Sequence, residues 1–498
     1  MQAYDLLAQK FERRAGIEDA LGILHWDSET TMPKGAAPYR SEATAALQGI
    51  AHDMLLDGEV AELLTAAEQR QDVLDGWQRG NLREMRRLFV QESAVPRDLV
   101  EAKSKAVFKA RMAWRGANDK NDFALLQAPL AEVAALQRDI GTAIGQRSNL
   151  AAYDALLDGF DPGLRKSFID PIFAQLRTAL PELIGEARSM QSSLPAKPLP
   201  KAALAAPAQR RLFEHLMRAI GFDFERGRLD SARQPFCGGA TDDVRITDRQ
   251  GEDDVLNALT ALFHECGHAL YEQGRPRQFL RQPVGSPRGL TVHESQALLM
   301  EMQACSTPEF VSYLAPLLRA AAGADGQAWS EANIDRLMNK VEPSLIRMDA
   351  DEMTYVLHAV VRYDLETAMI DGDLPVADLP EAYNAAIWRS LGMKVPDDRA
   401  GCLQDIHWAA GLWGYFPSYA LGAIVAAQLF EAACLAQPQM RRALANGNFA
   451  PLRDWLATNI YGKGSLFETG ELIAAATGQP LRTEPYLAYL RRRYIGEQ

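Results

Sequence analysis

Two histidines four residues apart are the clearest chemical signature of this sequence. His264 and His268 stand in the segment Phe-His-Glu-Cys-Gly-His-Ala, with Glu265 directly after the first histidine. Residues i and i+4 of a helix lie one above the other on one face, so both imidazole rings can reach one metal ion. Zinc accepts imidazole nitrogen, and catalytic zinc sites use three protein ligands and leave one position open. Glu265 lies beside that face, where a carboxylate can take a proton from a water molecule activated by the metal.

The motif alone leaves an alternative open, which is a helix with two ordinary histidines and no metal. The chain has 8 histidines in 498 residues, which gives about one chance match per hundred chains of this kind. A third ligand at a suitable place therefore decides between the two interpretations.

The third ligand must come from another element of the fold. Glu272 lies one turn beyond the motif, but a helix rises about 1.5 Å per residue, which separates Glu272 from His264 by roughly 12 Å along the axis. The best candidate is Glu294, because the Pro- and Gly-rich turn at 276–289 is long enough to bring its helical segment against the first one. A His-His-Glu site is the type found in thermolysin. Glu301, two turns further on, is expected to support the site rather than bind the metal directly.

The helix that would position the histidines has signals at both ends. Asp254 suits its N-terminus, and Gly274, followed by Arg-Pro, suits its end. Gly267 costs up to about 1 kcal/mol inside a helix. A small residue at this place would let another backbone or a substrate approach closely.

The rest of the chain has mainly helical periodicity, with apolar residues three and four apart. The clearest such segments are 131–144, 181–190, 208–220 and 336–365. The best extended segment is 243–247, where Val244 and Ile246 alternate with polar residues, and one or two neighbouring strands could pair with it. These patterns predict a mainly α fold with a small sheet. A Pro-rich spacer at 192–200 could divide an N-terminal helical lobe (1–200) from the lobe that carries the metal site (201–498).

The composition excludes several classes of protein. Apolar residues make up 47% and charged residues 24% of the chain, as in ordinary globular proteins. With 53 basic and 65 acidic residues, the net charge of −12 argues against nucleic acid as the main partner. The five cysteines are scattered without a Cys-x-x-Cys pair, which favours a reducing compartment. The most apolar stretch, 419–436, is interrupted by Gln428 and Glu431, so we expect a cytoplasmic protein with no membrane span.

Five short motifs follow one another along the chain. They are Asp-x-Arg-x-Thr at 243–247, His-Glu-x-x-His at 264–268, His-Glu-Ser-Gln at 293–296, Ile-Arg-x-x-Ala-Asp at 346–351 and Gly-x-x-Gln-Asp-x-His-Trp at 401–408. With a Trp-Asp, Met-Pro and Arg pattern at 26–40, they resemble the carboxypeptidase Taq family of metallocarboxypeptidases over essentially the whole chain.

The resemblance implies one catalytic domain over 1–498, an almost entirely helical, two-lobed fold with a deep central groove, similar in shape to neurolysin and angiotensin-converting enzyme. It implies a Zn²⁺ ion, for which Co²⁺ can substitute, and the removal of single residues from the C-termini of peptides. Peptides with a free C-terminal carboxylate are then the substrates, and a homodimer is the expected assembly.

Two departures from the family pattern concern the substrate. Gln234 replaces the histidine of a usual His-Pro-Phe, and glutamine cannot titrate. After Gln296 the chain continues with aliphatic residues at 297–300, where relatives tend to have Ser-Arg-Leu-Trp. Both changes leave the substrate preference and the rate open.

The motifs also suggest anchors for the substrate. Arg347 is the first choice for the terminal carboxylate, because a guanidinium group matches a carboxylate with two hydrogen bonds. Its alternative is a helical i,i+4 pair with Asp351, worth about 0.3–0.5 kcal/mol on a surface. Arg245 is the competing anchor, and a structural ion pair is equally plausible for it.

Donors to the oxygen of the attacked carbonyl are expected from the segment 407–419. A tyrosine hydroxyl or an imidazole can supply this contact, and similarity to related peptidases favours Tyr419 and His407, followed by Tyr415. The alternative is an aromatic core cluster. Two rival functions stay open: an oligopeptidase or dipeptidyl carboxypeptidase on the same fold, and a peptide-binding relative with weakened catalysis.

Overall fold

The protein folds into helices around one small sheet, as the periodicity predicts. The computed structural model describes residues 2–194, 198, 204–249 and 254–496. Within these residues helices dominate, and the strands form a single three-stranded sheet. The expected mainly helical fold is confirmed.

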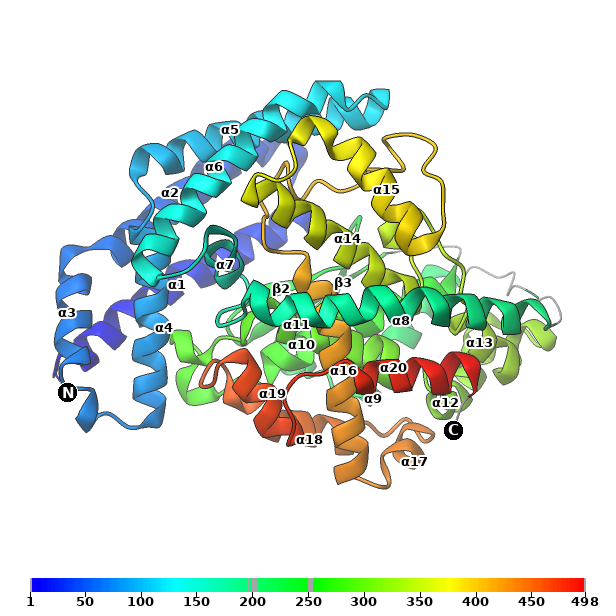
Figure 1. Cartoon of the computed structure of the whole chain (residues 1–498). Coiled ribbons are helices and arrows are strands. Elements are labelled where there is room, and N and C mark those ends of the chain that lie inside the picture. Colours follow the sequence, from blue (N-terminus) through cyan, green and yellow to red (C-terminus); the bar gives the residue numbers. More distant parts are fainter. Residues whose placement is uncertain (1, 195–197, 199–203, 250–253, 497–498) are drawn as a thin grey trace.

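The first four helices form a layer of their own at the N-terminal end of the molecule (Figure 1). They are α1 (Gln2–Thr30), α2 (Ala37–Leu56), α3 (Gly58–Glu68) and α4 (Gly76–Ser93). They enclose a separate apolar core that includes Leu7, Leu64 and Met85. The next helices belong to the main core, and they are α5 (Arg97–Lys120), α6 (Ala124–Ser148), α7 (Ala152–Asp158) and α8 (Lys166–Ser192).

The buried apolar side chains thus divide near residue 100. The smaller core extends from Tyr4 to Met85, and the main core extends from Ala106 to Tyr494. The two lobes at 1–200 and 201–498 stay a prediction. Most of the Pro-rich spacer expected between them lies outside the described residues.

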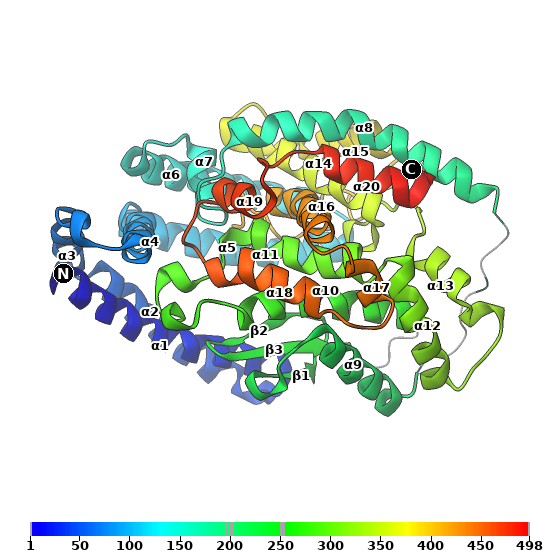
Figure 2. The ribbon, with the colours of Figure 1, turned by 90° about the horizontal axis from the view of Figure 1, so that it is seen from below.

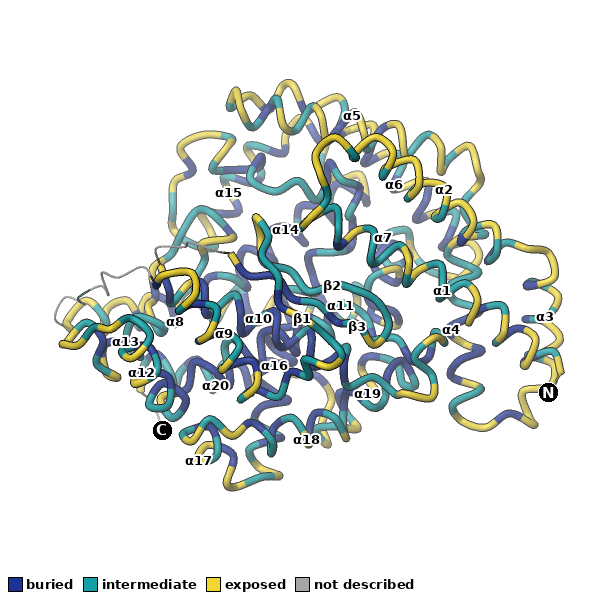
Figure 3. Tube along the Cα trace, turned by 180° about the vertical axis from the view of Figure 1, so that it is seen from behind, coloured by how far each residue is buried: buried dark blue, intermediate teal, exposed yellow. Residues whose placement is uncertain are grey.

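Four helices at the centre of the molecule carry the candidate site, and Figure 3 shows them as mainly buried. They are α10 (Val255–Gln273), α11 (Gly289–Leu298), α14 (Glu352–Asp371) and α16 (Pro417–Ala436). Helix α16 packs against both α11 and α14. It is long and apolar enough to cross a membrane, but 67% of its most apolar window is buried inside the protein, which explains its composition as that of a core helix.

The other helices after α8 lie around this centre (Figure 2). They are α9 (Ala206–Ile220), α12 (Pro308–Ala322), α13 (Glu331–Met338), α15 (Leu379–Leu391), α17 (Met440–Leu444), α18 (Ala450–Asn459), α19 (Thr469–Thr477) and α20 (Glu484–Leu490).

The sheet lies between α1 and α10 (Figure 2). Its strands are β1 (Gly227–Ser231), β2 (Cys237–Ala240) and β3 (Asp243–Asp248), in the order β1-β3-β2. Strand β3 is the predicted one, and it pairs parallel with β1 and antiparallel with β2. Helix α1 covers β2 closely, since a Cβ atom on Gly22 would lie 2.1 Å from the carbonyl oxygen of Gly239.

The expectation of continuous helix over 336–365 is wrong. Helix α13 ends at Met338 and α14 begins at Glu352, with a short 3₁₀ turn at Arg347–Asp349 between them. Pro343 disfavours helix at the preceding residue, and the Asp351 carboxylate caps α14 by accepting hydrogen bonds from the backbone of Met353 and Thr354. Arg347 therefore lies in a connecting segment.

Candidate metal centre

The two helices α10 and α11 bring three ligand atoms together. His264 and His268 project from α10 and Glu294 from α11, and one ligand atom of each lies within 4.8 Å of the others. Nε2 of His268 is 3.9 Å from Oε2 of Glu294. Two imidazole nitrogens and a carboxylate oxygen at this spacing are a donor set that suits one zinc-type ion. The residues present therefore fit the metal that the motif predicts.

The ends of α10 lie where the sequence predicts them. The helix spans Val255–Gln273, and the Asp254 side chain accepts hydrogen bonds from the backbone of Leu256 and Asn257. The backbone nitrogen of Gly274 closes the last turn. The aspartate cap satisfies two backbone donors that have no partner inside the helix.

Glycine lets α10 and α11 touch backbone to backbone. A Cβ atom on Gly267 would lie 2.2 Å from the carbonyl oxygen of Gln296, closer than real contacts allow. Gly422 of α16 has the same role on the other side, since a Cβ atom there would lie 2.8 Å from Cγ of Glu294. The close approach expected at Gly267 is thus made by the helix that carries the third ligand.

Hydrogen bonds orient both imidazole rings. Nδ1 of His264 is 2.7 Å from Oε2 of Glu301. Nδ1 of His268 is 3.1 Å from the carbonyl oxygen of His293, to which it must donate. Both rings therefore keep Nε2 for a metal ion, as supported metal ligands usually do. Glu301 thus contacts a predicted ligand, in agreement with the supporting place expected for it.

Glu272 is directed away from the three ligand atoms. Its carboxylate binds Nε2 of His293 at 3.0 Å and the Arg275 guanidinium at 2.8 Å. The ring of His293 stacks on that of His268 with centroids 4.5 Å apart. The helix-rise argument that excluded Glu272 as a ligand agrees with this arrangement.

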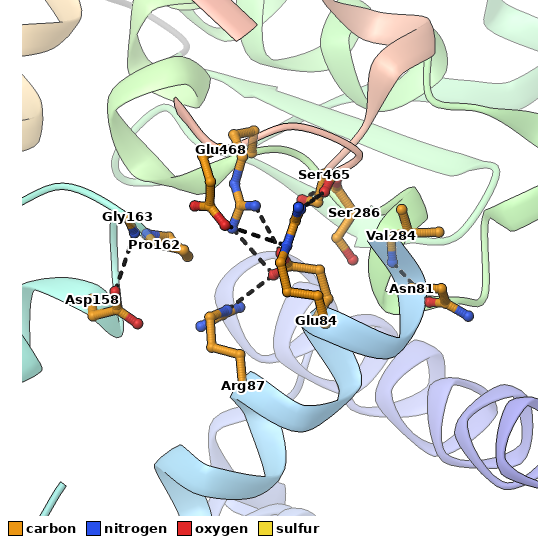
Figure 4. A network of polar contacts seen from close by, with 12 residues as sticks. Asn81, Glu84, Arg87, Asp158, Pro162, Gly163, Val284, Ser286, Ser465 and Glu468 are labelled. Atoms are coloured by element: carbon orange, nitrogen blue, oxygen red, sulfur yellow. Dashed lines mark hydrogen bonds and ion pairs between the residues drawn. The ribbon is translucent and has the colours of Figure 1, made fainter. Parts of the chain in front are cut away.

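The N-terminal end of α11 is held by two distant carboxylates. The buried Glu84 of α4 accepts hydrogen bonds from Nη1 and Nη2 of Arg288 at 2.9 and 3.2 Å. Burial alone would raise the pKa of Glu84, but Arg288 and Arg87 lower it to about 2. Figure 4 shows Glu84 facing Arg87. Asp161 accepts hydrogen bonds from both the backbone and the hydroxyl of Thr291. These contacts fix the helix that carries Glu294.

Glu265 lines the same cavity as two of the three candidate ligands. The cavity has a volume of about 380 Å³. The Glu265 residue is 8% exposed, and burial raises the pKa of its carboxyl to about 7. The cavity is also lined by His264, Glu294 and Arg347.

Arg347 is also buried and lines this cavity. Its Nε and Nη2 donate to Oδ1 of Asp405 at 3.1 and 2.9 Å, and its guanidinium carbon lies 5.0 Å from the ring centroid of Tyr419. No described residue accepts a hydrogen bond from Nη1. The alternative pairing with Asp351 is wrong, because Asp351 belongs to the next helix and caps it.

Comparison with known proteins gives the family of this chain. The family profile of carboxypeptidase Taq (M32) metallopeptidases matches residues 6–494. The chain belongs to this family. Thermostable carboxypeptidase 1 of Thermus thermophilus is 35% identical over 99% of this chain and 98% of its own length.

Solved structures of the family have the same fold. Trypanosoma cruzi metallocarboxypeptidase 1 superposes with a TM-score of 0.97 at 37% identity over 99% of both chains. An M32 carboxypeptidase from Deinococcus radiodurans gives a TM-score of 0.93 at 34% identity, again over 99% of both chains. This member of the carboxypeptidase Taq family is a metal-dependent carboxypeptidase.

The other predicted anchor, Arg245, does not line the metal cavity of this carboxypeptidase. It lines a separate cavity with Trp26 and Asp230. Its Nε donates to Asp243 at 2.9 Å, and its guanidinium carbon is 5.9 Å from the ring centroid of Trp26. This environment favours the structural ion pair that the sequence left open.

The three predicted carbonyl donors lie together, but only Tyr419 lines the metal cavity. Tyr415 and His407 lie behind it, with ring centroids 5.5 and 6.4 Å from that of Tyr419. Nδ1 of His407 is buried without a described hydrogen-bond partner, and burial lowers the pKa of this imidazole to about 4. His407 is therefore a neutral ring at the edge of the site.

The sequence analysis missed Tyr355 as a site residue. Its hydroxyl is 3.4 Å from Oε1 of Glu294, and its ring meets that of Tyr419 edge to face at 5.9 Å. No local motif marks it, because its direction depends on where α14 begins. Gln234 contributes its backbone carbonyl to the Thr247 hydroxyl, and the neighbouring Pro235 lines the metal cavity.

Proposed function

We propose that this carboxypeptidase binds one Zn²⁺ ion at His264, His268 and Glu294 and releases single residues from the C-termini of peptides. The observation that carries the proposal is the presence of a buried guanidinium, that of Arg347, in the cavity that is also lined by His264, Glu294 and Glu265. A bound divalent ion supplies Lewis-acid chemistry, because it polarises a carbonyl and makes a water molecule acidic. Co²⁺ can take the same donors.

Glu265 is the proposed general base. Its carboxylate takes the proton of the attacking water and passes it to the leaving amine, so one side chain serves both proton transfers. Because Glu265 is buried, its interactions with the attacking water and with the leaving amine are stronger than they would be in bulk water. Tyr419 is the proposed donor to the carbonyl oxygen, and Tyr415 and His407 are placed to hold the Tyr419 ring or to share that role.

Arg347 is the proposed anchor of the substrate carboxylate. A chain of contacts joins it to the ligand Glu294: the guanidinium lies over Tyr419, Tyr419 meets Tyr355, and Tyr355 contacts Glu294. Two aromatic rings thus lie between the anchor and the ligand. An anchor for a terminal carboxylate in the cavity of the candidate ligands supports cleavage near the C-terminus of a peptide.

The rival cleavage modes give different products. A dipeptidyl carboxypeptidase removes two residues at a time, an oligopeptidase cuts internal bonds, and a peptide-binding relative cuts none. The close grouping of the three candidate ligands, two of which share a cavity with Glu265, supports a catalyst over a binding protein.

Mass spectrometry of an unstructured peptide separates these possibilities. The zinc-loaded protein is incubated with the peptide beside the Glu265→Gln variant and a chelated sample. We expect a ladder that loses one C-terminal residue per step and is absent from both controls. Internal cuts or two-residue steps would contradict the proposal, and so would an undiminished ladder from the variant.

A homodimer and a cytoplasmic location complete the proposal. All five cysteines are among the described residues and all are free thiols, which supports a reducing compartment. Sedimentation at several protein concentrations tests the assembly.

A further inference from the structure

The π-helix that follows α11 contributes side chains to two different cavities. It spans Leu299–Ala304, and its residues Glu301 and Met302 line the metal cavity. Gln303 of the same π-helix lines a second cavity, which has a volume of about 470 Å³. Among the described residues, none lines both cavities. The second cavity, which we call the rear cavity, is therefore a separate candidate site.

A buried glutamine without a partner lines the rear cavity. Gln303 is 2% exposed, and its side-chain amide has no hydrogen-bond partner among the described residues. A side-chain amide has an acceptor oxygen and two donor hydrogens, and burying such a group without hydrogen bonds costs free energy. The amide of Gln303 is therefore available to a bound molecule that both donates and accepts hydrogen bonds.

Arg493 fixes one wall of the rear cavity. Its Nε donates to Oδ1 of Asn339 at 2.5 Å. Its Nη1 and Nη2 donate to the carbonyl oxygens of Met302 and Ser306 at 2.9 and 2.7 Å. All three nitrogens of this guanidinium thus have partners in the protein, and Glu352 lies 3.9 Å from it. Arg493 therefore shapes the rear cavity but is not a free cation for a ligand.

Two other arginines that line the rear cavity can bind an anionic group. Arg492 is exposed and has no hydrogen bond or ion pair with a described residue. Arg441 contacts the carboxylate of Glu309 only at 3.4 Å. A guanidinium group matches a carboxylate with two hydrogen bonds. The rear cavity can therefore accept the carboxylate of a ligand.

Two acidic side chains line the same cavity. Glu431 has no hydrogen bond or ion pair with a described residue. Asp335 accepts one hydrogen bond, from Nδ2 of Asn339 at 2.9 Å. An ammonium group has three donors and a positive charge, so it can pair with such carboxylates. Groups of both signs around one cavity favour a zwitterion over a polyanion or a simple cation.

Apolar side chains of α16 form another part of the lining. This helix extends from the centre of the molecule to its lower edge in Figure 1. Ala427, Phe430 and Cys434 line the rear cavity, and their spacing of three and four residues places them on one face of the helix. The neighbouring Leu435 also lines the cavity and is 77% exposed. So exposed a large apolar side chain gains buried area when a ligand covers it.

We propose that the rear cavity binds a free α-amino acid with an apolar side chain, such as leucine. Its carboxylate pairs with Arg492 or Arg441. Its ammonium group pairs with Glu431, and its side chain packs on Phe430, beside the amide of Gln303. The volume of the cavity lies in the range of small-molecule sites, about 300–1,000 Å³. The inference goes beyond the proposed function, although the residue that the proposed reaction releases belongs to the same chemical class.

Titration calorimetry with L-leucine on the zinc-loaded protein tests this site. Three further probes each lack one group of leucine: leucinamide lacks the carboxylate, N-acetyl-leucine lacks the ammonium group, and glycine lacks the apolar side chain. We expect saturable binding of leucine and an affinity about 10-fold lower for each of the other probes, because each loses one class of contact. Equal affinities of all four probes, or no saturable binding of leucine, would overturn the inference.

Variants assign the binding to the rear cavity. Gln303→Leu should lower the affinity for leucine about 10-fold, because it removes the amide. Arg492→Gln should lower it about two- to fivefold, as expected for one exposed charge pair. Since Arg492 is exposed, this variant folds even if Gln303→Leu does not. Arg442→Gln is the matched control and should leave the affinity unchanged, because Arg442 is exposed and does not line the cavity.

A variant in the metal cavity separates the inference from the proposed function. Arg347→Met should leave unchanged the leucine binding that Gln303→Leu weakens. Loss of leucine binding in Arg347→Met, but in neither Gln303→Leu nor Arg492→Gln, would place the amino acid in the metal cavity and overturn this inference, while the proposed function would stand. A zinc-loaded protein that binds leucine as expected but cleaves no peptide would overturn the proposed function alone.

Discussion

The carboxylate of Glu301 lies 2.7 Å from Nδ1 of His264 and so fixes the ring of a proposed metal ligand. Glu301 belongs to the π-helix that follows α11, and this helix turns it towards α10. A carboxylate in this position holds the imidazole tautomer that leaves Nε2 unprotonated, and it makes Nε2 a stronger ligand for a metal ion.

Replacing Glu301 with Gln should therefore weaken metal binding by about 10- to 100-fold. The affinity is measured by competition with a chelator of known strength. Glu272→Gln is the matched control, because Glu272 binds His293 and Arg275 rather than a ligand. Equal affinities of Glu301→Gln and the unaltered protein would contradict the role given to Glu301.

The anchor Arg347 should make the enzyme depend on a free C-terminus. A charge-assisted hydrogen bond contributes about 1.5–3 kcal/mol, so Arg347→Met should lower kcat/KM by roughly 10- to 100-fold for a peptide with a free carboxylate. A peptide of the same sequence with an amidated C-terminus lacks the terminal carboxylate, so we expect the unaltered protein to cleave it slowly. Arg347→Met should change this slow cleavage little. The fold survives this change because Asp405 keeps its bond to Arg362 at 2.6 Å.

Arg347→Lys serves as the conservative comparison for the anchor. It keeps the charge but not the paired geometry, so an intermediate loss is expected. An equal loss on the free and the amidated peptide would contradict the carboxylate role and favour a structural one.

The contact between α10 and α11 should not tolerate a side chain at Gly267. In Gly267→Ala the new methyl group meets the Gln296 carbonyl, and such overpacking costs about 1–3 kcal/mol. The variant should also bind metal more weakly, because α11 carries Glu294.

Gly185→Ala in α8 is the control, since nothing lies within 4 Å of its added carbon, and it should stabilise the protein by about 0.5–1 kcal/mol. Thermal unfolding with and without metal measures both effects, and unchanged unfolding and metal affinity of Gly267→Ala would contradict this packing.

Local signals were sufficient for the helix that carries His264 and His268. The spacing of His264 and His268, the Asp254 cap and the small Gly267 all act within one helix, where periodicity is reliable. Strand β3 was predictable for the same reason, because Val244 and Ile246 alternate. For Glu294 the only available argument was the length of the connection at 276–289, which is long enough to bring its helix against α10.

Features that depend on distant contacts were not predictable. The helical pattern continues through 339–351, but Pro343 and the Asp351 cap divide it, and this division places Arg347 in the cavity. Tyr355 faces Glu294 only because α14 begins at Glu352. The π-helix has no signature of its own in the sequence, since its mixture of apolar and polar residues also suits an α-helix. Arg245 and Arg347 have the same guanidinium group, so the residue type could not show which of them lines the metal cavity. Only the tertiary fold distinguishes them.

The buried Glu366 should make stability fall as the pH rises. Its carboxylate accepts hydrogen bonds from Tyr153, Trp408 and the backbone of Gly414, but burial still raises its pKa from 4.5 to about 7. The folded protein therefore holds this proton up to a higher pH than the unfolded chain does. The free energy of unfolding should decrease by up to about 3 kcal/mol between pH 4.5 and 7 from this group, and level off above that.

Glu366→Gln should remove this contribution, since the amide does not titrate. Denaturant unfolding at several pH values measures the difference in free energy between the two proteins, which should shift in favour of the variant as the pH rises. A difference that stays constant from pH 4.5 to 8 would show that Glu366 does not titrate in this range.

The most direct test of the account is a crystal structure of the zinc-loaded protein, with anomalous diffraction recorded above and below the zinc absorption edge. We predict one strong anomalous peak within bonding distance of Nε2 of His264, Nε2 of His268 and the carboxylate of Glu294. A protein that binds zinc tightly but has its peak elsewhere, or no peak among these three atoms, would contradict the central claim.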